Sequence, residues 1–403
     1  MTEKLPKKLL YNIVSADEVK NILLTLSDMG ARVENIGGSI EGRNIYSIRV
    51  GEGALRVSAV CRLHGNEPAP TNAALLFTYF ALKDGRILSL DLREALKNVS
   101  LTLVPLANPD GAQLYYTKHL ENPRPSWDNP IEIARVNSNG YDLNRDWLLL
   151  KQPETCSIHR MLNKVKPHIV LDMHEYCFGG GYPPKWPNKE GEFMITFTDT
   201  PYFWIDEDIK DISRKVMEEI ERGVKSEGWG HWPIKKRHFV GQAKGEDVVA
   251  LATFIGTHIP YENSAKVLVE TWGVGLGSYL LYDRVYIHMI ALAYTLYYAY
   301  ERREELQHRY GLVIDRCLND VGAEPKAYVV KGKDLEKAYR IISDHGLLSN
   351  LSDDELYVPA RQEKSRMVKI LLDKECPLND RLIKEKKFYT LDNFLDIKVK
   401  KKK

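Results

Sequence analysis

Residues 167–173, Pro-His-Ile-Val-Leu-Asp-Met, form an almost continuous apolar run with the length of one β-strand. A strand that is apolar on both faces has to be covered on both sides, which is typical of a parallel sheet packed between helices. Other strand-like segments alternate with helical ones before residue 305. The strand-like segments are residues 45–50, 55–63, 101–106, 193–198 and 266–270, and the helical segments are residues 16–29, 71–83, 153–165, 208–224 and 278–303. We therefore predict an α/β fold with a mixed, mostly parallel central sheet and helices on both faces.

The connection between two of these strands is rich in glycine. Gly51, Glu52 and Gly53 separate residues 45–50 from residues 55–63. A short glycine-containing connection between two strand-like segments is typical of a β-hairpin, so we expect a hairpin here.

The chain is longer than a single hydrophobic core usually supports. Its 403 residues exceed the roughly 250–300 residues at which one core stops growing. After about residue 305, short strand-like and helical segments follow one another at residues 327–330, 334–345, 356–358 and 365–372. We predict a large domain over residues 1–305, a small α/β accessory domain over residues 306–383, and a Lys-rich C-terminal tail over residues 384–403.

Positive and negative charges are nearly balanced in the whole chain. There are 57 Lys and Arg residues against 55 Asp and Glu residues, which gives a formal net charge of +2. This balance argues against a protein that coats nucleic acid. Residues 384–403 contain eight Lys and three acidic residues, and such basic ends are mostly solvated, although they can also bind an acidic partner.

The cysteines and the longest apolar segments indicate a cytoplasmic protein with no membrane partner. The five cysteines are odd in number and form no C-x-x-C pair, which favours free thiols in a reducing compartment. The apolar residues 9–14 are interrupted by Tyr11 and Asn12, unlike the core of a signal peptide. Residues 286–300 form an apolar run shorter than the about 20 residues that span a bilayer, and they predict a core helix.

Two strand ends carry residues that can bind a metal ion. His64 and Glu67 form an H-x-x-E pattern directly after residues 55–63, and His174 follows the apolar strand that ends at residue 173. Open α/β sheets bind their ligands at the carboxyl ends of the strands. Two imidazoles and one carboxylate, with a fourth position left to water, are typical of a catalytic zinc site, whereas Mg²⁺ prefers oxygen ligands. An H-x-x-E pattern alone is also compatible with a solvated pair at the start of a helix.

Further motifs follow this pattern in a defined order. They are Asn108-Pro109-Asp110-Gly111, residues 135–145 ending in Asp142-Leu143-Asn144-Arg145, His174, and Val267-Leu268-Val269-Glu270-Thr271. In this order the sequence closely resembles the zinc carboxypeptidase family of the carboxypeptidase A type, over about residues 40–275. The resemblance implies the fold of that family and one zinc ion per chain, bound by His64, Glu67 and His174.

The resemblance also implies roles for two carboxylates. Glu270 would be the general base that takes a proton from water and passes it to the leaving amine. Its position at the end of an apolar strand supports this role, because poor solvation raises the pKa of a carboxyl group. Asp142 would accept a hydrogen bond from the second ring nitrogen of His64. The alternatives are a surface glutamate at a strand end and an aspartate that caps its own turn.

Three or four polar residues would contact the substrate. The resemblance assigns Asn144 and Arg145 to the terminal carboxylate, which a guanidinium can bind with two parallel hydrogen bonds. It assigns Arg135 to the carbonyl oxygen on which negative charge develops. Arg124 is a competing candidate for the same role.

Some residues are poorly marked by the sequence. The family has a mobile tyrosine ahead of the base that contacts the substrate, and residues 241–262 offer Tyr261 and also His258 for this role, in a context that departs from the family motif; packing without contact to the substrate is the alternative. Cys61 and Cys177 lie close to the ligands, and we expect buried thiols because four protein ligands would leave no position for water. The other histidines lack a partner at ligand spacing, and we expect them to be structural or at the surface: His119, His159, His168, His231, His238, His288, His308 and His345.

The leading hypothesis is a zinc metallocarboxypeptidase, a hydrolase acting on a peptide or peptide-like amide that bears a free carboxylate. A first alternative is a zinc-dependent deacylase of N-acyl amino acids, which uses a similar arrangement of ligands. A second alternative is a non-catalytic binding protein that engages an acidic partner through residues 384–403.

Overall fold

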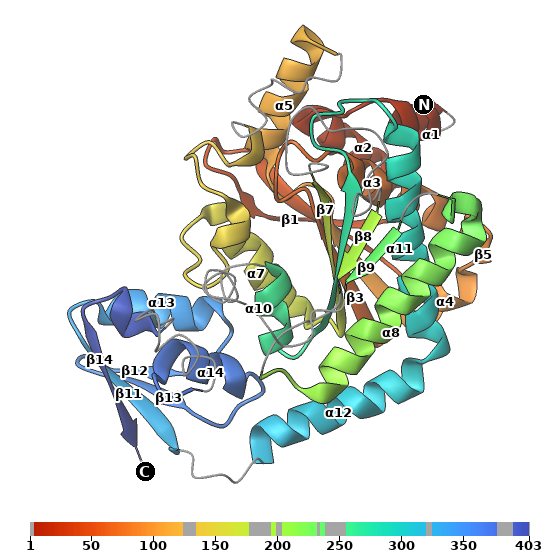
Figure 1. The fold of residues 1–403 in the computed structure, drawn as a ribbon. Coiled ribbons are helices and arrows are strands. Elements are labelled where there is room, and N and C mark those ends of the chain that lie inside the picture. Colours follow the sequence, from red (N-terminus) through yellow and green to blue (C-terminus); the bar gives the residue numbers. More distant parts are fainter. Residues whose placement is uncertain are drawn as a thin grey trace.

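A mixed eight-stranded sheet forms the centre of the larger domain. The structure is a computed structural model and describes residues 4–123, 134–176, 195–198, 204–231, 234–237, 255–319, 325–376 and 390–402. The strand order is β1-β2-β6-β3-β7-β10-β8-β9 (Figure 1). The strands are β1 (Arg32–Gly38), β2 (Asn44–Val50), β3 (Leu55–Cys61), β6 (Val99–Val104), β7 (Ile169–Tyr176), β8 (Ile195–Thr198), β9 (Ile234–Arg237) and β10 (Ala265–Trp272). The central strands β6, β3, β7 and β10 run parallel, and the strands on either side of them, β2 and β8, pair antiparallel with β6 and β10. At the edges, β1 is antiparallel to β2 and β9 is parallel to β8. The predicted fold class is confirmed.

Helices cover both faces of this sheet. They are α1 (Leu5–Tyr11), α2 (Ala16–Asp28), α3 (Ala69–Lys83), α4 (Arg93–Asn98), α5 (Pro109–Glu121), α7 (Pro153–Val165), α8 (Glu207–Val224), α10 (Ile255–Tyr261), α11 (Leu281–Glu301) and α12 (Arg303–Asn319). Alternate residues of a strand point to opposite faces. Leu171 of β7 therefore joins the core with α3, α8 and α11, while its neighbour Val170 packs with Ile158 and Leu162 of α7.

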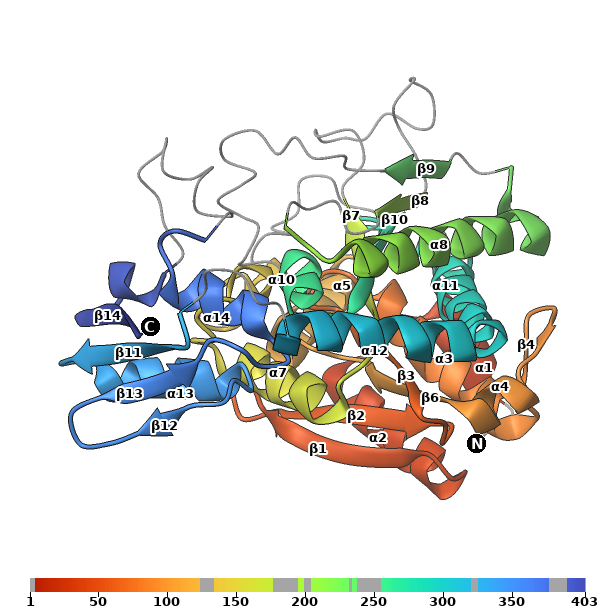
Figure 2. The same cartoon turned by 90° about the horizontal axis from the view of Figure 1, so that it is seen from below.

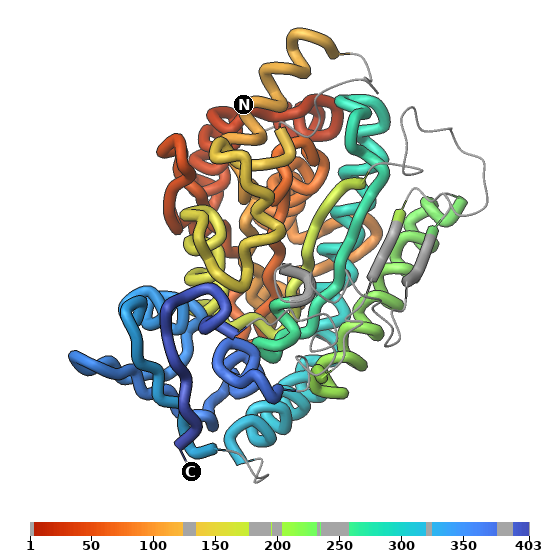
Figure 3. The backbone as a smooth tube through the Cα atoms, turned by 60° about the vertical axis from the view of Figure 1, so that its left-hand side comes forward, coloured from red at the N-terminus to blue at the C-terminus, as the bar shows by residue number. Residues whose placement is uncertain are grey.

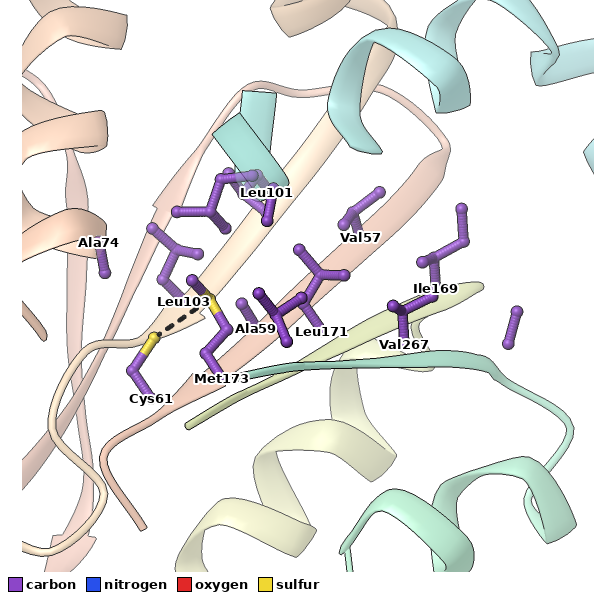
Figure 4. Close-up of a cluster of buried hydrophobic side chains, with 14 of the residues drawn as sticks. Val57, Ala59, Cys61, Ala74, Leu101, Leu103, Ile169, Leu171, Met173 and Val267 are labelled. Atoms are coloured by element: carbon purple, nitrogen blue, oxygen red, sulfur yellow. Dashed lines mark hydrogen bonds between the residues drawn. The ribbon is translucent and has the colours of Figure 1, made fainter. Parts of the chain in front are cut away.

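The parallel strands contribute a dense apolar layer on the face of the sheet that α3, α8 and α11 cover. Figure 4 shows Leu101, Ala59, Leu171 and Val267, one from each of β6, β3, β7 and β10, in this layer. Cys61 is buried here as a free thiol, and its Sγ lies 3.7 Å from Met173 Sδ. The predicted Cys177 thiol lies outside the described residues.

The predicted hairpin between residues 45–50 and 55–63 is wrong. β2 pairs with β1 and β6, and β3 pairs with β6 and β7, so β6 lies between the two strands that Gly51, Glu52 and Gly53 connect. A local turn signal cannot exclude a third strand that inserts from a distant part of the chain. The polar strand β1, whose residues are mostly half-buried or exposed, was not predicted because it lacks an apolar run.

The C-terminal residues build a smaller unit around a four-stranded sheet. Its elements are β11 (Ala327–Gly332), α13 (Leu335–Asp344), β12 (Asn350–Leu351), β13 (Leu356–Pro359), α14 (Ser365–Leu372) and β14 (Ile397–Lys402), with the sheet order β12-β13-β11-β14. Figure 3 shows this unit, in blue, at one end of the larger domain. Residues 397–402, assigned above to a solvated tail, form its edge strand β14, because each residue of β14 pairs with β11.

Helix α12 connects the two units and packs against the larger one (Figure 2). Arg309 of α12 binds Asp208 and Asp211 of α8 at 2.7 and 2.8 Å. Much of the chain just after residue 305 therefore lies on the larger domain. Within the described residues, no helix is both long and apolar enough to cross a membrane. The remaining short strands β4 (Arg86–Ile87) and β5 (Leu90–Asp91) form a separate two-stranded sheet.

Candidate metal centre

The loop after β3 and the end of β7 bring three potential metal ligands together. β3 and β7 are adjacent and parallel, so their carboxyl ends lie at the same edge of the sheet. His64 and Glu67 follow β3 directly, and His174 is part of β7. All three side chains are buried, and their ligand atoms lie within 4.8 Å of one another.

Glu67 lies between the two imidazoles. Its Oε1 is 2.7 Å from His64 Nδ1, and its Oε2 is 2.9 Å from His174 Nδ1. The other nitrogens face carboxylates: His64 Nε2 is 3.1 Å from Asp142 Oδ1, and His174 Nε2 is 2.7 Å from Asp172 Oδ1. A carboxylate on the outer nitrogen orients an imidazole so that its inner nitrogen can bind a metal ion. The two Nδ1 atoms and the Glu67 carboxylate thus form a set of nitrogen and oxygen donors suited to zinc.

The electrostatics of the three residues are those of a buried anion between two basic rings. Burial alone would raise the pKa of Glu67, but His64 and His174 hold it well below its ordinary value. Burial would lower the pKa of His174, but Asp172 and Glu67 raise it well above its ordinary value. Without a bound cation the site therefore attracts protons, and a divalent cation can take their place.

The motif Asn108-Pro109-Asp110-Gly111 holds the loops around this site. The Asn108 side chain accepts a hydrogen bond from Gly111 N at 2.9 Å and donates to Leu63 O and Arg135 O, both at 3.3 Å. Gly65 lies so close to this helix start that an added Cβ would be 2.1 Å from the Gly111 carbonyl carbon. The motif therefore fixes the loop that carries His64 against the backbone of Arg135.

Two arginines lie next to the three ligands. Arg135 Nε donates to Asp142 Oδ2 at 3.2 Å, and its Nη1 is 3.7 Å from Glu67 Oε1. Arg145 is more exposed and lies 3.9 Å from Asp142 Oδ2. Asn144 is beside it in the short helix η2 (Leu143–Arg145), where its backbone N–H donates to Asp142 Oδ1 at 2.8 Å. Asp142 thus links His64 to both arginines, and Arg124 lies outside the described residues.

Glu270 lies beside the ligands on the neighbouring strand. In the parallel register of β7 and β10, Glu270 pairs with His174. Burial raises the pKa of Glu270, and the nearby negative charges of Glu67 and Asp172 add to this effect against the attraction of His174. A carboxyl group with a raised pKa can both accept and return a proton near neutral pH.

Neither Tyr261 nor His258 is brought to this site. Tyr261 is fully buried in α10, which precedes β10, and Glu270 lies near the opposite end of that strand. His258 lies on the same helix and contacts other histidines instead. The resemblance suggested both because they precede Glu270 in the sequence, but the extended strand β10 carries the chain from one edge of the sheet to the other.

A buried ion pair that supports the site was missed by the sequence analysis. Arg284 of α11 donates to both carboxylate oxygens of Glu175, at 2.6 and 3.0 Å, and both side chains are fully buried. Glu175 also accepts hydrogen bonds from Ala69 N and Thr271 Oγ1. The pair therefore ties α3, β7, β10 and α11 together next to His174. The sequence offered one sign that Glu175 belongs to the site, namely its position directly after the predicted ligand His174.

Comparison with known proteins agrees with this geometry. The zinc carboxypeptidase family model matches residues 25–161. Carboxypeptidase 2 of Trichophyton rubrum is 28% identical over 165 residues, which are 40% of this chain and 26% of that protein. The chain thus spans about a quarter of the length of this relative.

Two solved structures share the fold at low sequence identity. A metallo-carboxypeptidase from Burkholderia cenocepacia has a TM-score of 0.50 and 14% identity, covering 69% of this chain and 68% of its own. Bovine thrombin-activatable fibrinolysis inhibitor, in complex with tick carboxypeptidase inhibitor, has a TM-score of 0.50 and 14% identity, covering 73% and 99%. Residues 25–161 are thus similar to the zinc carboxypeptidase family, and the fold of the larger domain is similar to that of solved carboxypeptidase structures.

Proposed function

We propose that this protein is a zinc metallocarboxypeptidase that hydrolyses the C-terminal peptide bond of a peptide or peptide-like substrate. The observation that carries the proposal is the convergence of His64, Glu67 and His174 at one sheet edge, with Glu270 on the adjacent strand. Three protein ligands leave the fourth position of a tetrahedral zinc ion to water or substrate, which is the composition of a catalytic site. When bound, one zinc ion would act as a Lewis acid towards the carbonyl group and would acidify the attacking water.

The side chains around the ligands divide the remaining chemistry. Glu270 accepts a proton from the attacking water and passes it to the nitrogen of the leaving amine as the carbon–nitrogen bond breaks. Arg135, next to Glu67, donates hydrogen bonds to the carbonyl oxygen as it becomes negative. Asp142 keeps the His64 ring oriented and holds Arg135 at the same time.

Recognition of the substrate carboxylate is proposed for Arg145 and Asn144. The Arg145 side chain is nearly half exposed, with 46% of its surface accessible, so it can reach a ligand. A guanidinium binds a carboxylate with two parallel charge-assisted hydrogen bonds. A peptide with an amidated C-terminus is neutral at that end and has only one acceptor oxygen there, so it would bind more weakly.

The test compares three matched substrates with the zinc-loaded full chain. We expect release of the terminal residue from a peptide with a free C-terminus and much slower release from its amidated form. Cleavage of N-acyl amino acids in preference to the peptide would identify a deacylase instead. Absence of hydrolysis of every substrate, with zinc bound at His64, Glu67 and His174, would identify a non-catalytic protein.

The proposed location is the reducing cytoplasm. The cysteines at positions 61, 156, 317 and 376 are free thiols. Burial raises the pKa of the Cys156 thiol to about 11, so this side chain is protonated near neutral pH and reacts slowly with oxidants.

A further inference from the structure

A second cluster of metal-binding side chains lies where the small C-terminal unit meets the larger domain. His159 is on α7, His258 is on α10, Glu262 directly follows α10, and His345 directly follows α13. One ligand atom from each lies within 4.8 Å of the others. The expectation that His159 and His345 have no partner at ligand spacing is therefore wrong, because the fold joins positions that are far apart in the sequence.

Four of the six distances between ligand atoms in the cluster, from 3.1 to 3.8 Å, are close to the edge length of a tetrahedron around zinc. His159 Nε2 is 3.2 Å from His258 Nε2 and 3.1 Å from Glu262 Oε1. Glu262 Oε1 is 3.5 Å from His258 Nε2 and 3.8 Å from His345 Nδ1. Zinc–nitrogen and zinc–oxygen bonds of about 2.0–2.1 Å place neighbouring ligand atoms about 3.3 Å apart in a tetrahedral site.

A backbone carbonyl fixes which ring nitrogen of His345 carries the proton. His159 Nδ1 lies 2.9 Å from Asp344 O and 3.2 Å from Asn163 Nδ2, and His345 Nε2 donates to Leu148 O at 2.9 Å. A carbonyl can only accept, so the proton of His345 is on Nε2 and the lone pair of its Nδ1 faces the cluster. His345 Nδ1 is fully buried and has no hydrogen-bond partner among the described residues. A buried acceptor without a partner is costly, and a cation would satisfy it.

Lys364 neutralises only part of this cluster. Its Nζ donates to Glu262 Oε1 at 2.8 Å, to His345 O at 3.0 Å and to Asn163 Oδ1. These contacts include the carboxylate but none of the inward-facing ring nitrogens. The ammonium group therefore explains the buried charge of Glu262 but provides no donor for His345 Nδ1.

We propose that His159, His258, Glu262 and His345 bind a structural zinc ion, in addition to the ion proposed at His64, Glu67 and His174. Three imidazoles and one carboxylate suit zinc, and four protein ligands leave no open position for catalysis. A surface cleft lined by Asn163, Glu262 and Lys364 lies beside the cluster.

This second zinc ion would connect the C-terminal unit to α7 and α10, the helices that precede two strands of the first metal site. Helix α7 precedes β7, which carries His174, and α10 precedes β10, which carries Glu270. His345 is contributed by the C-terminal unit. The second zinc would therefore hold the C-terminal unit against both of these helices.

The experiment measures zinc per chain by mass spectrometry in full-length protein prepared without chelators. The His64→Gln variant removes a ligand of the first site and leaves the second cluster untouched. We expect wild type to contain two zinc ions per chain, His64→Gln to keep one, and the double variant His64→Gln/His345→Gln to contain none. The matched control His168→Gln changes a histidine outside both clusters and should keep both ions.

A second measurement covers the case in which loss of His345 prevents folding. Crystals of wild type measured at the zinc absorption edge should show an anomalous peak between His159, His258, Glu262 and His345. In folded His64→Gln, a chelator should lower the melting temperature by several degrees. A folded His64→Gln protein without stoichiometric zinc, or crystals without this peak, would overturn the proposal.

Discussion

His174 and Glu270 are direct partners in the parallel register of β7 and β10. Neighbouring strands in a sheet are about 4.8 Å apart, so this pairing places the proposed base beside a proposed metal ligand without help from a loop. Both residues are held by the most regular part of the structure. Such rigid placement is what catalysis by a positioned general base requires.

Replacing Glu270 with Gln should abolish most of the turnover while the zinc content stays the same. The amide keeps the shape of the side chain but cannot accept the proton of the attacking water. Loss of a general base typically costs about 10²–10⁴-fold in rate. We suggest measuring kcat and bound zinc on the same preparation, with the exposed Glu94→Gln as control. Activity within about threefold of wild type would rule out this role for Glu270.

Replacing Arg145 with Met should weaken binding of substrates that have a free C-terminal carboxylate. A hydrogen bond to a charged group contributes about 1.5–3 kcal/mol, which corresponds to a rise in KM of roughly 10- to 150-fold. Amidated substrates should show little change. If both substrates were affected equally, Arg145 would not be the residue that recognises the carboxylate.

Replacing Arg135 with Met should instead lower kcat. Its contact with Asp142 and its position 3.7 Å from Glu67 place it beside a proposed metal ligand, which supports its proposed role at the carbonyl oxygen. Removal of one donor to a developing oxyanion costs about 10²–10³-fold in kcat. Steady-state kinetics that showed a change in KM alone would contradict this assignment. Arg93→Met, which alters an exposed ion pair, is the control.

Breaking the buried pair between Glu175 and Arg284 should strongly destabilise the fold. Arg284→Met leaves the Glu175 carboxylate buried without its partner, which typically lowers the free energy of unfolding by about 3–5 kcal/mol. The double variant Glu175→Gln/Arg284→Met should recover part of this loss, because it buries no uncompensated charge. Urea unfolding of the two variants gives the difference. A double variant less stable than Arg284→Met would show that the pair is not the origin of the effect.

Stability should fall as the pH is lowered through the range in which His168 titrates. Burial, with the charge of Arg56 adding to it, lowers the pKa of His168 from 6.5 to about 4. Between these values the unfolded chain takes up a proton and the folded chain does not. The contribution is therefore complete above pH 6.5 and is lost progressively towards pH 4, to a total of roughly 3 kcal/mol.

The matched experiment compares wild type with His168→Gln in urea unfolding at several pH values. The variant should lose less stability than wild type between pH 6.5 and pH 4. The exposed His308→Gln serves as control and should follow wild type. Parallel pH curves for wild type and His168→Gln would exclude His168 as the source of the dependence.

The sequence by itself determined the features that depend on neighbouring residues. The apolar run at residues 167–173 determined a buried parallel strand, and its alternation with helical segments determined the class of the fold. The order of motifs from His64 to Glu270 identified a set of residues that the sheet then brings together. These residues lie close together because parallel strands end at one edge of a sheet, so residues just after different strands become neighbours.

Only the tertiary structure decided which strands and helices are neighbours. β6 separates β2 from β3 although a glycine turn connects them, and the extended strand β10 separates Tyr261 from Glu270. His159, His258 and His345 come from three elements whose distances in the sequence contain no ligand spacing. The spacing of His258 and Glu262, one helical turn apart, was the only local sign. Contacts between distant segments depend on how whole surfaces pack, and a local pattern does not encode that choice.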